Sequence, residues 1–347
     1  MEKEDGGTTG MIFPFTAIVG QEEMKTGLIL NVIDPSIGGI LIMGEKGTAK
    51  STAVRALADL LPEMEVVKEC PFNCNPEDVL CSRCRERLRS EGPLPREKKK
   101  MRVVELPLGV TEDRLVGTLD IEYALKKGEK RFEPGILARA NRNFLYVDEV
   151  NLLEDHIVDL LLDSAAMGVN TVEREGVSFT HPSKFILVGT MNPEEGDLRP
   201  QLLDRFGLCV QVTSIQDKAL RMEILRRKGD FDSNPSQFVK IWGAEQKALS
   251  QKIMSAKGKL NTIKVTEDLL EKIVHITLSL SLDGHRADIV IMKSARAISA
   301  LRGKMFIDSE DIRGAAQLSL RHRLKRFPFE EIGKESEKVQ AVLSRIG

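Results

Sequence analysis

The chain has 347 residues, which is enough for about two domains at roughly 150 residues each. Hydrophobic residues make up 41% and charged residues 30%, an ordinary balance that excludes a wholly disordered chain. The formal net charge of −1 does not favour a nucleic-acid partner, because dedicated nucleic-acid binders usually carry a basic excess.

Residues 1–12 are predicted to form a mobile tail. The first ten residues are polar and glycine-rich and do not have the apolar core of a signal peptide. The sequence also has no run of roughly 18 apolar residues that could span a membrane. We therefore expect a cytoplasmic protein without membrane contact.

Residues 13–213 are predicted to form an α/β nucleotide-binding domain. Short apolar runs at 39–43, 144–147 and 184–188 predict buried strands, and segments of helical periodicity alternate with them. This alternation is typical of a parallel sheet flanked by helices. Residues 170–182 alternate apolar and polar side chains and predict a β-hairpin insertion.

Residues 214–347 are predicted to form a smaller all-α C-terminal domain, because helical patterns dominate there. We expect breaks between these helices at 228–235 and at 282–284, where glycine, proline, asparagine and aspartate gather. The domain boundary is placed near Ser214.

A glycine-rich loop follows the first predicted strand and leads into a helix. Its residues are Gly44, Glu45, Lys46, Gly47, Thr48, Ala49, Lys50 and Ser51. Glycines let backbone N–H groups approach phosphate oxygens, and the helix directs its positive dipole end at the same anion. Lys50 is predicted to reach the β- and γ-phosphates of ATP, and the Ser51 hydroxyl to ligate Mg²⁺. Ala49 stands where a second glycine is usual, and we expect the loop to tolerate its methyl group.

Polar residues follow the second and third predicted strands. Asp148 is expected to hold the water shell of Mg²⁺, and Glu149 to act as general base toward the attacking water. Asn192 can orient that water or contact the γ-phosphate, although an asparagine before a proline is also typical of a plain turn. Arg205 and Arg286 can stabilise charge on the transferred phosphoryl group, whereas either one alone could be a solvated side chain.

Four of the five cysteines lie close together, at Cys70, Cys74, Cys81 and Cys84. Four thiolates can close a tetrahedral zinc site, but the middle gap is shorter than in typical zinc ribbons. A redox-sensitive set of thiols, or cysteines without a joint role, are the alternatives. Cys209 lies in an apolar run and is expected to be a small core residue.

The order of these motifs resembles the AAA+ family of P-loop ATPases, and more narrowly the I-subunit family of magnesium chelatase. The narrower resemblance covers most of the chain from Phe13 to about Glu331. It rests on FPFTAIVGQ at 13–21, DPSIGG at 34–39, GILARAN at 135–141, TMNPEEG at 190–196, LDRFG at 203–207, LDGHRA at 282–287 and SLRHR at 319–323.

This resemblance implies roles for individual residues. Residues 18–21, Val19 among them, would border the adenine. Asn192 would be the first sensor, and Arg286 would be the second, closing on the nucleotide from the helical domain. Arg205 would be a finger supplied to the ATP of a neighbouring subunit, which requires a homo-oligomeric ring, in this family a hexamer.

The resemblance also implies two insertions. The hairpin at 170–182 would be the insertion before the first sensor. Residues 107–130 would carry an insertion in the second helix, a feature of the chelatase-like branch.

The function implied by the resemblance is ATP hydrolysis with Mg²⁺ in tetrapyrrole biosynthesis. The motor would drive a D-type AAA+ subunit and a large H-type subunit that holds the tetrapyrrole for insertion of Mg²⁺, with cobalt or nickel as alternative metals. A nucleic-acid-remodelling ATPase of the same branch is the competing function, supported by basic residues at 98–100 and 321–326. A non-enzymatic ATP switch is disfavoured, because it would need neither Glu149 nor Arg205.

Overall fold

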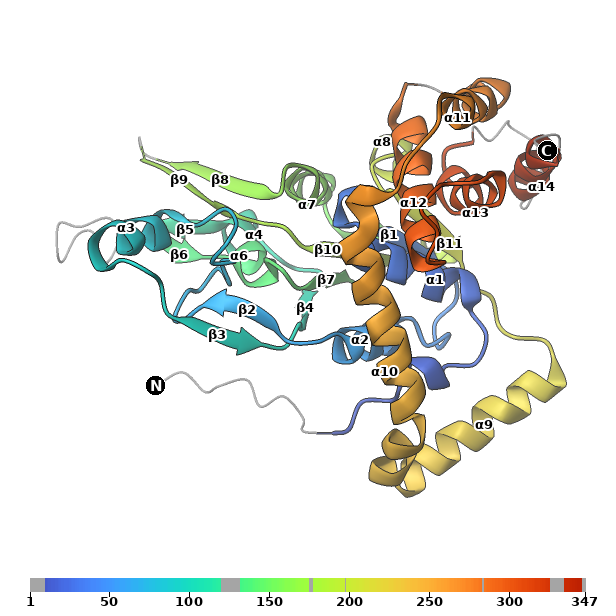
Figure 1. Ribbon diagram of the computed structural model, residues 1–347, viewed down its shortest axis with the longest axis horizontal. Helices are drawn as coiled ribbons and strands as arrows, with labels where there is room; N and C mark the ends of the chain where they lie inside the picture. The colour runs from blue at the N-terminus through green and yellow to red at the C-terminus, as the bar shows by residue number, and fades with distance from the viewer. Residues whose placement is uncertain are drawn as a thin grey trace.

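The computed structural model describes residues 10–119, 132–174, 177–196, 198–282, 284–324 and 334–344. Its centre is a parallel sheet of five strands in the order β11-β1-β10-β7-β4 (Figure 1). The strands are β1 (Ile40–Met43), β4 (Val103–Leu106), β7 (Phe144–Val147), β10 (Ile186–Met191) and β11 (Leu208–Gln211). The predicted parallel sheet is therefore confirmed.

The third predicted strand, at 184–188, is shifted in the structure. The backbone N–H of Lys184 donates to Oδ1 of Asn141 at 2.9 Å, and its carbonyl accepts from the N–H of Arg142 at 2.6 Å. These bonds place Lys184 in the connection before the strand. The strand itself, β10, continues through Gly189 and Thr190 to Met191, because these residues pair with β1.

Side chains alternate between the two faces of the sheet and build two cores. Ile40 and Ile42 face α1 (Glu22–Ile33) and α2 (Lys50–Leu60), whereas Leu41 faces the opposite side. The opposite side is covered by α4 (Glu112–Val116), α6 (Ile136–Ala140), α7 (Asp155–Met167) and α8 (Pro200–Leu203).

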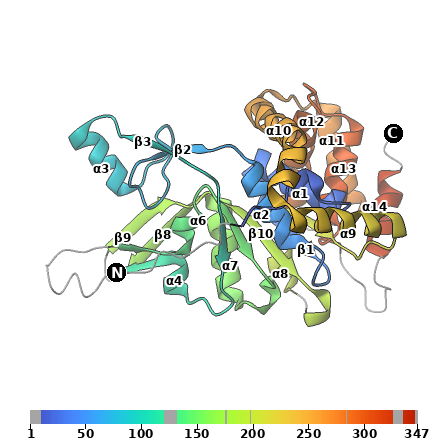
Figure 2. The ribbon, with the colours of Figure 1, turned by 90° about the horizontal axis from the view of Figure 1, so that it is seen from below.

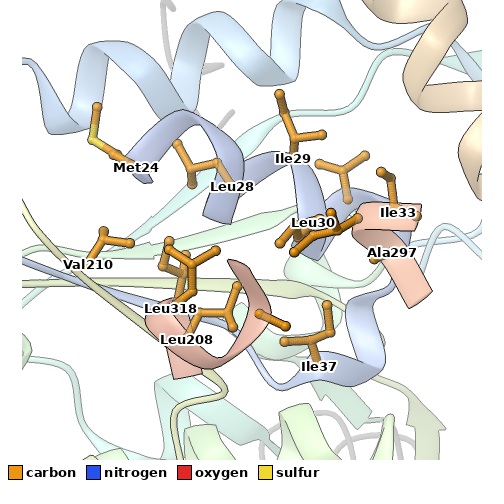
Figure 3. Close-up of a cluster of buried hydrophobic side chains, with 14 of the residues drawn as sticks. Met24, Leu28, Ile29, Leu30, Ile33, Ile37, Leu208, Val210, Ala297 and Leu318 are labelled. Atoms are coloured by element: carbon orange, nitrogen blue, oxygen red, sulfur yellow. The ribbon is translucent and has the colours of Figure 1, made fainter. Parts of the chain in front are cut away.

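The first core continues into the C-terminal helices. Figure 3 shows Leu28 and Leu30 of α1, Leu208 and Val210 of β11, and Leu318 of α13 in one cluster. Leu28, Leu30 and Leu208 are 0% exposed. The sheet and the helices behind it thus share one apolar interior.

The chain after β11 is helical, as predicted. Its helices are α9 (Lys218–Ser233), α10 (Pro235–Lys259), α11 (Glu267–Ser279), α12 (Arg286–Leu301), α13 (Ser309–Leu320) and α14 (Lys334–Leu343). The break expected at 228–235 is narrower than predicted: α9 continues to Ser233, and α10 begins at Pro235 after Asn234, whose Oδ1 accepts from the N–H of Gln237 at 3.1 Å. No helix in the described ranges is long and apolar enough to cross a bilayer.

Three antiparallel strand pairs lie at the end of the molecule away from the C-terminal helices, at the left of Figure 1 and Figure 2. They are β2 (Met64–Val67) with β3 (Arg96–Lys99), β5 (Gly117–Leu119) with β6 (Phe132–Pro134), and β8 (Val169–Arg174) with β9 (Val177–Pro182). The helix α3 (Ser82–Glu91) lies between β2 and β3 in sequence.

The β8–β9 hairpin corresponds to the hairpin predicted at 170–182, and residues 175–176 of its turn lie outside the described residues. The insertion expected at 107–130 is described as far as residue 119, and residues 120–131 lie outside.

Candidate functional site

The glycine-rich loop has a conformation that restricts which residues it accepts. Gly44 has φ +148°, and a Cβ there would lie 2.0 Å from the carbonyl oxygen of Val212. Gly47 has φ +81°, and Ala49 has φ +62° directly before Lys50, the first residue of α2. A left-handed alanine costs about 1 to 2 kcal/mol relative to ordinary backbone. The backbone of the loop is therefore strained at Ala49.

Lys50 folds back over the loop. Its Nζ donates to the carbonyl oxygens of Gly44 and Glu45, the latter at 3.0 Å. Partial burial lowers the pKa of Lys50, while the carboxylates of Asp148 and Glu149 act in the opposite direction. Ser51 lies in the first turn of α2 and is exposed.

Thr190 joins the ends of two neighbouring strands. Its hydroxyl donates to Oδ1 of Asp148 at 2.6 Å and accepts from the backbone N–H of Glu149 at 3.1 Å. The Tyr146 hydroxyl also donates to Oδ1 of Asp148, at 3.0 Å, and burial raises the pKa of Tyr146. Glu149 has φ +51°, a left-handed conformation that turns the chain at the end of β7. No role was predicted for Thr190 from the sequence, although it lies two residues before Asn192.

Lys46 bridges two carboxylates at the mouth of the site. Its Nζ lies 2.9 Å from Glu149 and 2.9 Å from Glu195. The contact with Glu149, and then that with Glu195, raises the pKa of Lys46, and the contact with Lys46 lowers the pKa of Glu195. The bridge from Lys46 to Glu149 and Glu195 could not be predicted from the sequence, because the three residues come from separate segments.

The loop and the strand ends line one cavity of about 1010 Å³. The predicted residues that line it are Ile18, Val19, Gln21, Lys46, Gly47, Thr48, Ala49, Lys50, Ser51, Asp148, Glu149 and Asn192. Gly44 and Glu45 lie at the base of the loop, where a carboxylate oxygen of Glu45 accepts from the hydroxyl of Ser214 at 3.1 Å. Asn192 also caps the next turn, because its Oδ1 accepts from the N–H of Glu194 at 3.3 Å.

One wall of the cavity was not predicted. It comes from α9, whose side chains Arg221, Ile224, Leu225, Lys228 and Phe231 face the loop. The helix has little apolar periodicity, so this placement could not be predicted from the sequence.

The two predicted arginines lie elsewhere. Arg205 is paired with Asp159 at 3.0 Å and with Asp163 at 2.7 Å, both on α7. Arg286 begins α12 and lies 3.5 Å from Asp204. Neither is among the described residues that line the cavity, so this chain by itself does not bring them to its own loop.

The basic segment near the C-terminus is structural where it is described. Arg323 has a side chain only 3% exposed and donates to carbonyl oxygens of the turn at 204–207. His322 contacts the carbonyl oxygen of Phe206 at 3.0 Å, and Arg321 pairs with Glu23 at 3.2 Å. Because residues 321–323 make these contacts within the chain, they no longer favour a nucleic-acid interface. Residues 325–326 lie outside the described residues.

The four clustered cysteines converge. Their sulfur atoms all lie within 4.8 Å of one another, all four residues are buried, and every cysteine of the chain is a free thiol. Backbone N–H groups donate to two of these sulfurs, from Cys81 to Cys74 at 3.2 Å and from Cys84 to Cys81 at 3.5 Å. Cys209 lies apart from them in β11 and is 1% exposed, as predicted for a core residue.

Comparisons with known proteins cover nearly the whole chain. Residues 120–201 match the family described as magnesium chelatase, subunit ChlI, and residues 270–342 match the AAA lid domain. A magnesium-chelatase subunit ChlI homolog from Methanocaldococcus jannaschii is 55% identical over 333 residues, which cover 96% of this chain and 91% of that protein. Magnesium-chelatase subunit ChlI from a Nostoc species is 53% identical over 97% of this chain and 90% of its own length.

Solved structures agree with these matches. A chain in a complex between subunits BchI and BchD of magnesium chelatase, based on cryo-electron microscopy, has 46% identity and a TM-score of 0.55, and the match covers 96% of this chain and 99% of that one. A putative ATPase from Cytophaga hutchinsonii, with 19% identity and a TM-score of 0.64 over 95% of this chain and 91% of its own, shares the fold.

Proposed function

Because this chain belongs to the magnesium chelatase subunit I family of AAA+ ATPases, we propose that its ATP hydrolysis drives insertion of Mg²⁺ into a tetrapyrrole held by another subunit. The observation that carries the proposal is a nucleotide cavity that contains the phosphate loop and the acidic pair but not the arginines. The site is complete only if another subunit supplies them.

The residues present fit ATP with Mg²⁺. The turn at Gly44–Ser51 points the N-terminus of α2 into the cavity, where backbone N–H groups can hold phosphate oxygens. Ser51 and Asp148 would hold Mg²⁺, which would neutralise charge on the phosphates. The Nζ of Lys50 can exchange its two carbonyl acceptors for phosphate oxygens.

The general base is restrained in the structure. Glu149 must be free to take a proton from water, yet its carboxylate is paired with Lys46. We propose that Lys46 leaves Glu149 when nucleotide phosphates enter the cavity and attract the lysine. Asn192 lines the same cavity as Glu149, where its amide can orient the water.

Arg205 and Arg286 act on a neighbouring subunit in this proposal. Both lie next to Asp204 and outside the chain's own cavity, on a surface that also includes α7. A ring of identical subunits, a hexamer as the family resemblance implies, places this surface against the next cavity. The complex of BchI with BchD supports a D-type AAA+ partner, and the tetrapyrrole would be held by a large H-type subunit.

A mixing experiment tests the inter-subunit site. Arg205→Ala protein should bind ATP but hydrolyse it about 10³-fold more slowly, and Lys50→Ala protein should bind it more weakly and not hydrolyse it at its own loop. Mixing the two should restore activity, because an intact cavity can then face an intact Arg205. Arg55→Ala, which removes an exposed arginine paired with Glu105 on another surface, is the matched control. Absence of rescue in rings that native mass spectrometry shows to be mixed would overturn the inter-subunit role.

The chelatase step requires its own assay. ATP-dependent Mg²⁺ insertion into a porphyrin, followed by absorbance with D-type and H-type subunits present, should require this chain and should fail with Glu149→Gln. Insertion at the full rate without this chain would refute the proposal. The free thiols are compatible with the reducing cytoplasm expected from the sequence.

We also propose that the four clustered cysteines hold a structural zinc ion. A tetrahedral site with Zn–S bonds of about 2.3 Å needs sulfurs about 3.8 Å apart. Cys70 and Cys81 have their sulfurs at 4.0 Å, and all four sulfurs lie within 4.8 Å of one another, so a contraction of at most about 1 Å would complete the site. The backbone N–H groups that donate to sulfur are the outer partners that thiolate ligands usually have.

A further inference from the structure

Residues 64–99, here called the cysteine module, have a core of their own. Seven of its eight buried side chains form one cluster with Ala138: Val67, Cys70, Phe72, Cys74, Cys81, Cys84 and Leu94. This cluster is separate from the two cores on the faces of the sheet. Four of the module's eight buried side chains are cysteines, so the module has little apolar surface to hold it together. Units of this size usually need a metal or disulfides for stability.

The helix α3 shows this dependence most clearly. All ten of its residues are described, and Cys84 is the one that is buried. Its one aliphatic residue, Leu88, is 45% exposed. A short helix without an apolar face is not stable by itself. The helix is held instead by polar contacts: the Cys81 sulfur accepts from the N–H of Cys84 in the first turn, and Arg87 donates to the carbonyl oxygen of Lys68 at 3.2 Å.

Phe72 connects the module to the β8–β9 hairpin. It lies between two of the cysteines, is 3% exposed, and stacks on His181 of β9 with ring centroids 4.8 Å apart. Its ring also lies 5.9 Å from that of Phe179, which stacks on Phe132 of β6 at 4.1 Å. One aromatic cluster thus joins the module to two antiparallel strand pairs, β5 with β6 and β8 with β9.

The backbone of Phe72 makes a second connection. Its carbonyl oxygen accepts from Nδ2 of Asn141 at 2.6 Å, and Oδ1 of Asn141 accepts from the N–H of Lys184 at 2.9 Å. Asn141 lies before β7, and Lys184 lies between β9 and β10. The side chain of Lys184 returns to the module, where it pairs with Asp78 at 2.9 Å.

We infer that the metal bound by the four cysteines holds the β8–β9 hairpin in place, with Phe72 as the connecting residue. The site takes one zinc-class divalent ion as a tetrathiolate. Metal loss frees α3 and withdraws Phe72 from His181, so that β9 loses its packing while the nucleotide cavity remains intact. The inference rests on the zinc site proposed above and is independent of the chelatase function.

Placement of the hairpin connects this metal site to the inter-subunit surface. The strand β8 begins directly after α7, and α7 carries Asp159 and Asp163, the two partners of Arg205. Loosening the hairpin therefore loosens the end of α7 beside Arg205. We expect metal loss to reduce the ATPase activity that depends on neighbouring subunits while leaving nucleotide affinity unchanged.

The experiment compares full-length protein before and after treatment with a chelator. Untreated protein should contain about one zinc per chain. After chelation, hydrogen exchange in α3 and in β9 should become at least about tenfold faster, while exchange in β1 and α2 should not change. Cys84→Ala should behave like the chelated protein, and Cys209→Ala, which removes a buried cysteine outside the cluster, should retain zinc and protection.

Phe72→Ala separates the connection from the metal site. It should retain zinc and a protected α3 but show faster exchange in β9. A β9 that stays protected in this variant while zinc is bound, or that stays protected after chelation has removed the zinc, would overturn the inference. Protein without zinc that was never exposed to chelator would overturn the metal site itself. Neither result bears on the chelatase function, which the metal-insertion assay tests separately.

Discussion

Replacement of Arg323 by alanine is the sharpest test of how the Arg205 surface is built. The Arg323 guanidinium donates to the Asp204 carboxylate at 3.0 Å and to the carbonyl oxygens of Asp204, Phe206 and Gly207 at 2.9, 2.7 and 3.1 Å. It also donates to the carbonyl oxygen of Ser319 at the end of α13. One side chain therefore satisfies most acceptors of the turn that contains Arg205.

The expected cost follows from these contacts. Removing one partner of a buried ion pair costs about 3 to 5 kcal/mol, because the remaining polar groups lose their partners. Asp204 is itself half exposed and water can reach it, so the lower end of that range applies. We expect Arg323→Ala to lower the free energy of unfolding by about 3 kcal/mol and to reduce ATPase activity, since the turn no longer fixes Arg205.

Urea denaturation followed by circular dichroism measures the change in stability. The matched control is Arg321→Ala, which breaks a surface pair with Glu23 and should cost less than about 1 kcal/mol. Equal losses in the two variants, or a loss below about 1 kcal/mol for Arg323→Ala, would refute the idea that Arg323 builds this turn.

Three further predictions concern the cavity and the hairpin. Glu149→Gln should keep ATP affinity and lower turnover by about 10² to 10⁴-fold, measured by phosphate release; near-normal turnover would exclude Glu149 as the base. Lys50→Ala should weaken ATP binding in a fluorescence titration, and an unchanged affinity would argue against the assigned loop. Burial lowers the pKa of His181, so the unfolded chain binds a proton that the folded chain does not bind, and stability should fall as the pH drops below about 6.5. His181→Asn should flatten this part of the pH profile in urea titrations, and an unchanged slope would contradict the buried neutral histidine.

The parts of the molecule that could be predicted are those with a local physical signal. The bounds of β7 were predicted because Phe144–Val147 is a fully buried apolar run before a turn. The phosphate loop was predicted because its conformation depends on its own residues, Gly44 and Gly47 above all. A helix was expected after the break at 282–284, and α12 begins at Arg286.

The parts that could not be predicted depend on partners distant in sequence. The strand β3, Arg96–Lys99, consists of charged residues, and it forms because β2 pairs with it and Glu65 neutralises Arg96 at 3.0 Å. The bridge from Lys46 to Glu149 and Glu195 joins segments that meet only in the folded sheet. Whether the four cysteines converge could not be decided from the sequence, because their spacing alone does not determine the path of the chain between them.

The shared core behind the sheet has a mechanical consequence. Swinging α12 and α13 away from α1 and β11 would expose side chains such as Leu28, Leu30 and Leu318, at about 1.5 to 3 kcal/mol each. These helices therefore turn together with the sheet as one stiff body. By contrast α9, described along its whole length, has no buried residue. The segment 212–217 joins it to β11, and at its other end it joins α10, where Phe231 packs against Phe13 and Phe238. A conformational change driven by ATP can thus have two parts. In one part α9 moves beside the nucleotide, and in the other the sheet with α12 and α13 rotates as one body against a neighbouring subunit.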